Sequence, residues 1–213
     1  PLYSSAASDV YKRQALRRLS DARRDGNKVY AVIKGIGSSS DGRSNSIYAP
    51  HADGQRVALR RAYDDARCDP SSVELFEAHA TGTAVGDKTE LTALGKMLRA
   101  NTDEEAFAAL GSVKSQIGHT KGAAGTASLI KLALGLHHKI LPGTINVSRP
   151  NPVITDGAPY YVNSLTRPWV LDPHRPVRRA AVSAMGFGGT NFHMVLEEAD
   201  TDRSGVRTWH QTP

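Results

Sequence analysis

Two histidines and a lysine lie where apolar stretches of this sequence give way to small polar residues. His79 follows one such stretch, and Lys114 and His119 follow the next one along the chain. Side chains at the carboxyl ends of strands in an open α/β sheet face the ligand-binding edge. Neutral imidazoles there donate hydrogen bonds to a carbonyl that becomes an enolate, and a nearby ammonium adjusts the local potential. The spacing therefore indicates a site that stabilises a developing oxyanion, although either histidine alone is more often a structural residue.

Hydroxyl and backbone donors accompany these side chains. Thr81 and Thr83 follow the first histidine in a glycine-bearing loop. A third segment, residues 186–193, has the sequence Gly-Phe-Gly-Gly-Thr-Asn-Phe-His, whose backbone amides are able to form an anion-binding nest. The chain has one cysteine, Cys68, which excludes an internal disulfide and a Cys-rich zinc or iron–sulfur site.

These segments together resemble the motifs of β-ketoacyl synthases, the ketosynthase domains of fatty-acid and polyketide synthases. The family pattern Glu-Ala-His-Gly-Thr-Gly-Thr, two residues, Gly-Asp is met over residues 77–87 with one departure, Ala80 in place of glycine. The pattern Lys-Ser, one residue, Ile-Gly-His-Thr is met over residues 114–120. The glycine segment continues to Leu-Glu-Glu-Ala over residues 186–199. The amino-acid sequence of these segments is most similar to that of iterative multidomain enzymes that make polyunsaturated fatty acids or enediyne-type polyketides.

The resemblance implies a thiolase-like α/β fold and a decarboxylative Claisen condensation. In the family, a cysteine takes an acyl group from the phosphopantetheine arm of an acyl carrier protein. Two histidines then promote decarboxylation of a malonyl extender and stabilise the enolate that attacks the acyl thioester. Carried over by motif, His79 and His119 are these catalytic histidines, and Lys114 is the lysine that supports the site.

The resemblance also implies how the substrate is held. Thr81 and Thr83 would contact the pantetheine arm. In the turn formed by Phe187, Gly188 and Gly189, the phenylalanine would gate the pocket, and its backbone amide would serve the acyl oxyanion. No covalently bound cofactor and no metal are implied. The implied partners are an acyl carrier protein, malonyl and acyl thioesters, and a second copy of the intact enzyme in a homodimer.

The family's nucleophile has no counterpart in these motifs. It lies in an Ala-Cys-Ser-Ser type elbow upstream of them, and no such segment occurs in this chain. Cys68 stands at a predicted helix end, just before Asp69-Pro70, and is expected to be structural. The chain therefore resembles the C-terminal half of a ketosynthase, an incomplete fold that is predicted not to form an acyl-enzyme by itself. A truncated or misassembled reading frame and a split enzyme remain the two explanations.

Apolar periodicity predicts the elements that position these segments. Strands are expected over residues 28–37, 73–78, 109–114, 160–162, 179–184 and 192–197, and helices over 20–26, 55–67, 87–98 and 118–139. Asp87 and Glu90 have the spacing of a capping box. The helix over 118–139 is apolar around nearly its whole circumference, which predicts burial between other layers. Strands alternate with helices and the chain ends on a hairpin, so we expect a mixed sheet with a buried helix.

The chain divides into three parts by composition. Residues 1–14 are polar and aperiodic and are expected to be a foreign or disordered leader. Residues 15–199 carry the resemblance and form the ketosynthase portion. Residues 200–213 are polar and are expected to be a disordered tail.

Composition and charge limit the function classes. The chain has 213 residues, of which 39% are hydrophobic and 23% charged, as in globular domains. Its net charge of +6 suits an acidic carrier protein. Aromatic residues do not interleave with the basic ones, which argues against nucleic acid binding. The sequence has no apolar run of about 18 residues, as a spanning helix needs. One cysteine fits a reducing compartment, so we expect a cytoplasmic protein without a membrane segment.

Two rival hypotheses would also account for the net positive charge. A non-catalytic remnant for carrier binding or dimer contact would bind the carrier even after both histidines are replaced. A nucleic-acid binder would show a DNA affinity that falls steeply with salt. Degradative thiolase chemistry fits less well than decarboxylative condensation, since a second catalytic cysteine is missing from the sequence.

Overall fold

The computed structural model describes residues 16–42, 49–186 and 188–199, and its centre is a six-stranded mixed sheet. The strand order is β1-β8-β7-β2-β3-β5. The strands are β1 (Ala31–Ser40), β2 (Leu75–Glu77), β3 (Ala108–Gly111), β5 (Tyr160–Val162), β7 (Arg179–Gly186) and β8 (Thr190–Glu198). β2 pairs in parallel with β3 and β7, and β3 pairs in parallel with β5, whereas β8 runs antiparallel to β1 and β7. β4 (Ile140–Leu141) and β6 (Arg167–Pro168) form a separate pair.

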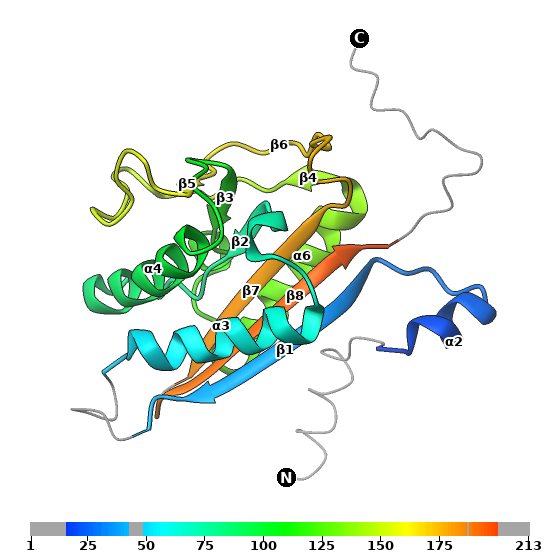
Figure 1. Ribbon diagram of the computed structural model, residues 1–213, viewed down its shortest axis with the longest axis horizontal. Helices are drawn as coiled ribbons and strands as arrows, with labels where there is room; N and C mark the ends of the chain where they lie inside the picture. The colour runs from blue at the N-terminus through cyan, green and yellow to red at the C-terminus, as the bar shows by residue number, and fades with distance from the viewer. Residues whose placement is uncertain (1–15, 43–48, 187, 200–213) are drawn as a thin grey trace.

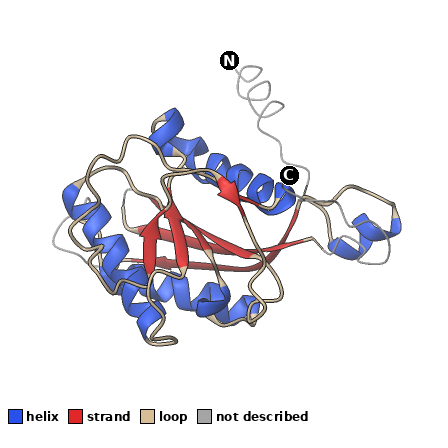
Figure 2. Ribbon diagram, turned by 90° about the horizontal axis from the view of Figure 1, so that it is seen from above, coloured by secondary structure: helices blue, strands red, loops and turns tan. Residues whose placement is uncertain are grey.

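Helices cover both faces of the sheet (Figures 1 and 2). α3 (Ala52–Ala66) and α4 (Ala84–Arg99) pack on one face, and α6 (Ala124–His138) packs on the other. The short helices are α2 (Leu19–Arg24), α5 (Lys114–Ile117) and two 3-10 turns, Pro70–Ser72 and Lys121–Ala123. Successive side chains of a strand point to opposite faces, so Phe76 joins the core under α3 and α4 while Leu75 joins the core under α6. The expected layered α/β fold is confirmed.

Glycines in β1 allow α3 to lie directly on the sheet. A β-carbon added at Gly35 or Gly37 would collide with backbone atoms of Ala62 or Ala58 in α3. Any larger residue would therefore push the helix outward and open the core beneath it. The Gly-Ile-Gly spacing of the strand thus sets the distance between these two layers.

The start of α4 differs from the sequence expectation. The helix begins at Ala84, three residues before Asp87, and Thr83 is its N-cap, with a hydroxyl that accepts from the Gly86 N–H at 3.2 Å. The capping box predicted for Asp87 and Glu90 is therefore wrong.

The predicted helix over residues 118–139 is shorter and less enclosed than expected. It consists of the 3-10 turn Lys121–Ala123 followed by α6, which buries one face against the sheet. Its outer face carries Ile130 and Leu134, which are 43% and 42% exposed. No helix in the described part of the chain has both the length and the hydropathy of a membrane-spanning segment. The predicted leader and tail lie outside the described residues.

Candidate functional site

His79 and His119 meet at the carboxyl ends of two neighbouring strands. His79 lies two residues beyond the end of β2, and His119 follows α5, the short helix that leaves β3. Because β2 and β3 are parallel neighbours, the segments that leave them start from the same edge of the sheet. The two ring centroids are 5.5 Å apart, and the rings are almost perpendicular, at 87°. The structure therefore brings together the two histidines that the sequence singled out.

The main chain determines which nitrogen of His119 carries the proton. Its Nδ1 accepts a hydrogen bond from the backbone N–H of Lys121 at 3.0 Å. A neutral imidazole that accepts at Nδ1 carries its proton on Nε2. Desolvation lowers the pKa of His119, and the charges of Lys114 and Lys121 lower it further. The exposed ring is therefore a neutral Nε2–H donor near pH 7.

His79 is held by its backbone and kept neutral by its surroundings. Burial lowers its pKa to about 4, with smaller contributions from Lys114 and His119. Its Nδ1 is buried and has no hydrogen-bond partner among the described residues. Both imidazoles are thus uncharged at neutral pH, the state in which each offers one donor and one acceptor.

Lys114 stands beside this histidine pair. It is the first residue of α5, is half-buried, and its charge lowers the pKa of both histidines. Burial lowers the pKa of Lys114 itself, while the carboxylates of Glu90 and Glu77 oppose that change. The site therefore combines two neutral hydrogen-bond donors with a partly desolvated cation, as oxyanion stabilisation requires.

Glu90 is a site residue that the sequence interpretation missed. Its carboxylate accepts from the backbone N–H groups of His79, at 2.7 Å, and Ala80, at 2.9 Å. Burial raises its pKa to about 7, and these two hydrogen bonds oppose that rise. One signal in the sequence could have identified it: Glu90 lies on the apolar stripe of α4, in line with Leu94 and Met97. A charged residue on a buried helix face needs a hydrogen-bonding partner, so this position predicts one.

Ala80 lies in a conformation that favours glycine. Its φ is +33°, and it directly follows His79. Ala80→Gly is expected to raise the free energy of unfolding by about 0.5–1 kcal/mol, because relief of the left-handed strain exceeds the entropy that glycine loses on folding. Urea denaturation measures the change. Ala84→Gly in the first turn of α4 is the control and is expected to destabilise; a lower urea midpoint for Ala80→Gly would contradict the prediction.

The two predicted substrate-binding threonines flank the turn after Ala80. The hydroxyls of Thr81 and Thr83 are 3.1 Å apart, and both residues are exposed. Gly82 between them has a φ of +79° and donates its N–H to Asp87 at 3.2 Å. Thr83 also caps α4, so its hydroxyl has a structural task besides any contact with a substrate.

The glycine turn lies further along the same sheet edge. Gly188 and Gly189 have φ values of +86° and +76° and close the β7–β8 hairpin. The carbonyl of Gly189 accepts from the backbone N–H of Asp41 at 2.7 Å. No hydrogen bond joins the two glycines to either histidine in the described part of the structure. Phe187, the predicted gate, lies outside the described residues.

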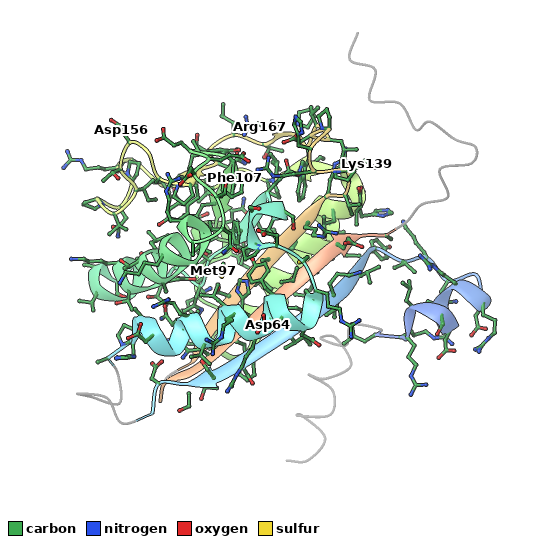
Figure 3. The ribbon with its side chains drawn as sticks, in the orientation of Figure 1. Asp64, Met97, Phe107, Lys139, Asp156 and Arg167 are labelled. Carbon is green, nitrogen blue, oxygen red and sulfur yellow. The ribbon has the colours of Figure 1, made fainter. Side chains whose placement is uncertain are left out.

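Cys68 is remote from the histidine pair. The charge with the largest effect on its pKa is that of Arg179, the first residue of β7, so the thiol lies near the amino end of that strand, at the opposite end of the sheet. Burial raises the pKa of this thiol. The cysteine lines a groove of about 800 Å³ between α3 and α4, together with Asp64 and Met97, which Figure 3 labels. Within the described ranges, no group of three histidine, cysteine or acidic side chains is placed to hold a metal ion.

Known proteins are similar to this chain in both sequence and fold. Residues 30–148 match the family described as β-ketoacyl synthase, C-terminal domain. One relative, from the polyunsaturated fatty acid synthase of Thraustochytrium sp. (strain ATCC 26185 / S-3), is 48% identical over 205 residues, which cover 93% of this chain and 7% of that protein. The polyketide synthase PksL of Bacillus subtilis (strain 168) is 41% identical over 92% of this chain and 4% of its own.

Solved ketosynthases have the same architecture. The ketosynthase from module 6 of the bacillaene synthase of Bacillus subtilis 168 superimposes with a TM-score of 0.82 at 42% identity, over 86% of this chain and 33% of that one. Ketosynthase twelve from the bacillaene polyketide synthase of Bacillus amyloliquefaciens gives a TM-score of 0.82 at 38% identity. The chain thus spans about a third of each solved ketosynthase. With its matched domain and its fold, the chain belongs to the β-ketoacyl synthase family.

Proposed function

We propose that this chain supplies the decarboxylation machinery of a β-ketoacyl synthase. The reaction is the decarboxylative Claisen condensation of an acyl thioester with a malonyl-type extender on an acyl carrier protein. One observation carries the proposal: two neutral imidazoles, His79 and His119, lie with their ring centroids 5.5 Å apart beside Lys114. That set of donors suits an enolate, whose oxygen gains negative charge as carbon dioxide leaves.

The chemistry follows from the donors. In the malonyl thioester, the bond between the carboxylate carbon and the α-carbon breaks, and its electron pair moves into the thioester to form an enolate. The Nε2–H of His119 donates to the enolate oxygen, and His79 completes the pair of donors. The enolate carbon then attacks the acyl thioester, a carbon–carbon bond forms, and the thiolate leaves. The positive charge of Lys114 stabilises the enolate, whose oxygen carries negative charge at this stage.

The nucleophile and the substrate contacts belong to the same proposal. We assign the acyl-accepting cysteine to the part of the ketosynthase domain that this chain does not span, because Cys68 lies at the opposite end of the sheet. Thr81 and Thr83 contact the pantetheine arm, and the turn of Phe187, Gly188 and Gly189 serves the acyl oxyanion. The exposed Ile130 and Leu134 of α6 pack against the rest of the domain.

Partners follow from the same interpretation. An acyl carrier protein brings the malonyl and acyl thioesters, and the net charge of +6 favours an acidic carrier. The intact enzyme is a homodimer. These assignments rest on family membership and on charge.

The experiment uses a chimera. The matching C-terminal portion of the bacillaene module 6 ketosynthase is replaced by this chain, and release of carbon dioxide from a malonyl carrier is measured. The chimera is expected to release carbon dioxide well above the buffer rate, and Cys68→Ser is expected to keep the rate within about twofold, because the thiol is far from the histidines. A rate equal to that of buffer would contradict the proposal. Carrier binding that survives loss of both histidines, with no release, would instead favour the carrier-binding remnant.

A further inference from the structure

An ion pair is buried directly beneath the histidine site. The Nζ of Lys131 in α6 donates to Oε2 of Glu77, the last residue of β2, at 2.7 Å. The Glu77 side chain is 0% exposed and that of Lys131 is 8% exposed. Buried ion pairs often contribute little to stability, because desolvation of the charges offsets their attraction. Fold stability alone is therefore a weak reason for this pair to be present.

The second oxygen of the same carboxylate binds two further segments. Oε1 of Glu77 accepts from the backbone N–H of Val113 at 2.5 Å and from the hydroxyl of Ser128 at 3.4 Å. Val113 immediately precedes Lys114, and Ser128 lies on α6. One carboxylate thus joins β2, the turn that carries Lys114, and the helix that follows His119.

Gly111 lies next to the Lys131 ammonium. A β-carbon added at Gly111, the last residue of β3, would lie 3.4 Å from the Lys131 ammonium and would collide with the hydroxyl of Thr144. A side chain at this position would therefore have to move Thr144, while its β-carbon would only touch the ammonium. The end of β3 thus lies in contact distance of the ion pair.

We propose that Glu77 and Lys131 are a positioning pair that holds Lys114 and the two histidines in register for decarboxylation. Glu77 fixes the residue before Lys114 relative to His79, which lies two residues beyond Glu77. Lys131 supplies the countercharge, so that Glu77 does not draw the Lys114 ammonium down into the core. This inference rests on the proposed function of the histidine site and deepens it, since neither member of the pair is assigned a contact with substrate.

The test compares single and double variants of the chimera. Glu77→Gln and Lys131→Met each leave a buried group without its partner, so for these two single variants only folding is measured. The double variant Glu77→Gln/Lys131→Met removes both charges without leaving either unpaired, and it weakens the bond from the Val113 N–H from a charge-assisted to a neutral one. It is expected to fold, yet to lose about tenfold in decarboxylation rate with unchanged KM for the malonyl carrier, because misplaced groups slow chemistry more than binding. The single variant Lys131→Arg keeps the positive charge, and its decarboxylation rate is expected to stay within about threefold of that of the parent chimera.

A matched control and a second readout separate this inference from the function it rests on. The exposed pair of Asp53 and Arg56 on α3 is neutralised in the same way and is expected to change no rate. In the full chain, nuclear magnetic resonance follows the Val113 amide and the ring nitrogens of His79 and His119, which are expected to shift in the Glu77/Lys131 double variant.

A folded double variant with wild-type rate and unshifted rings would overturn the positioning role. If the parent chimera releases no carbon dioxide, the proposed function fails, and the ring signals alone decide the inference.

Discussion

Replacing His119 with alanine is expected to lower malonyl decarboxylation in the chimera by about 10²–10³-fold, the usual cost of losing one oxyanion donor. The physical reason is the fixed tautomer, since the backbone N–H of Lys121 occupies Nδ1 and leaves the proton on Nε2. His79→Ala is expected to cause a loss of similar size, because this imidazole is the partner donor at 5.5 Å. Carbon dioxide release from a malonyl carrier at saturating concentration measures both.

The double histidine variant and a remote histidine complete this experiment. Groups that act on one oxyanion are not additive, so the double variant is expected to lose less than the product of the two single losses. His174 is exposed and far along the chain from both motifs, and His174→Ala is the control that should keep the parent rate. Alanine variants of both site histidines that decarboxylate as fast as the parent would refute the assigned role.

Acid is expected to destabilise the fold through a different histidine. His193 in β8 is 1% exposed, and burial lowers its pKa to about 3. Its Nδ1 lies 3.0 Å from the Ser183 hydroxyl, and its ring packs beside Tyr63 with centroids 5.5 Å apart. The core therefore accepts this imidazole only in its neutral form.

The sign of the effect follows from proton uptake. Between pH 6.5 and about 3 the unfolded chain binds a proton at His193 that the folded chain does not, so stability falls as the pH is lowered through this window. The loss approaches about 5 kcal/mol when the window is crossed. His79, with its pKa of about 4, adds a loss of the same sign.

One buried acid acts in the opposite direction. The raised pKa of Glu90, about 7, means that the folded chain holds a proton that the unfolded chain releases above pH 4.5, so this group lowers stability as the pH rises from 4.5 to 7.

The variant His193→Gln tests the role of His193, because it keeps a hydrogen-bonding side chain and removes the titration of the imidazole. Urea unfolding at several pH values between 4.5 and 7 is expected to show a shallower acid loss in that variant. Equal slopes in variant and parent would contradict the role of His193.

The sequence alone determined the family, the order of the strands and longer helices around the main sheet, and the histidine pair. Alternating side chains along the strands put Leu75 and Phe76 on opposite faces, and the motifs placed His79 and His119 at strand ends. These features are local in sequence, because a strand's period and a turn's residues depend on neighbours along the chain.

Only the tertiary structure decided the features that join distant segments. It assigned Glu90 to the backbone of the His79 loop rather than to a capping box, and it paired Glu77 with Lys131 across 54 positions of sequence. It also left the outer face of α6 exposed, where the periodicity predicts enclosure. A buried polar group takes whichever partner the packed layers bring within hydrogen-bond distance, and spacing along the chain does not encode that partner.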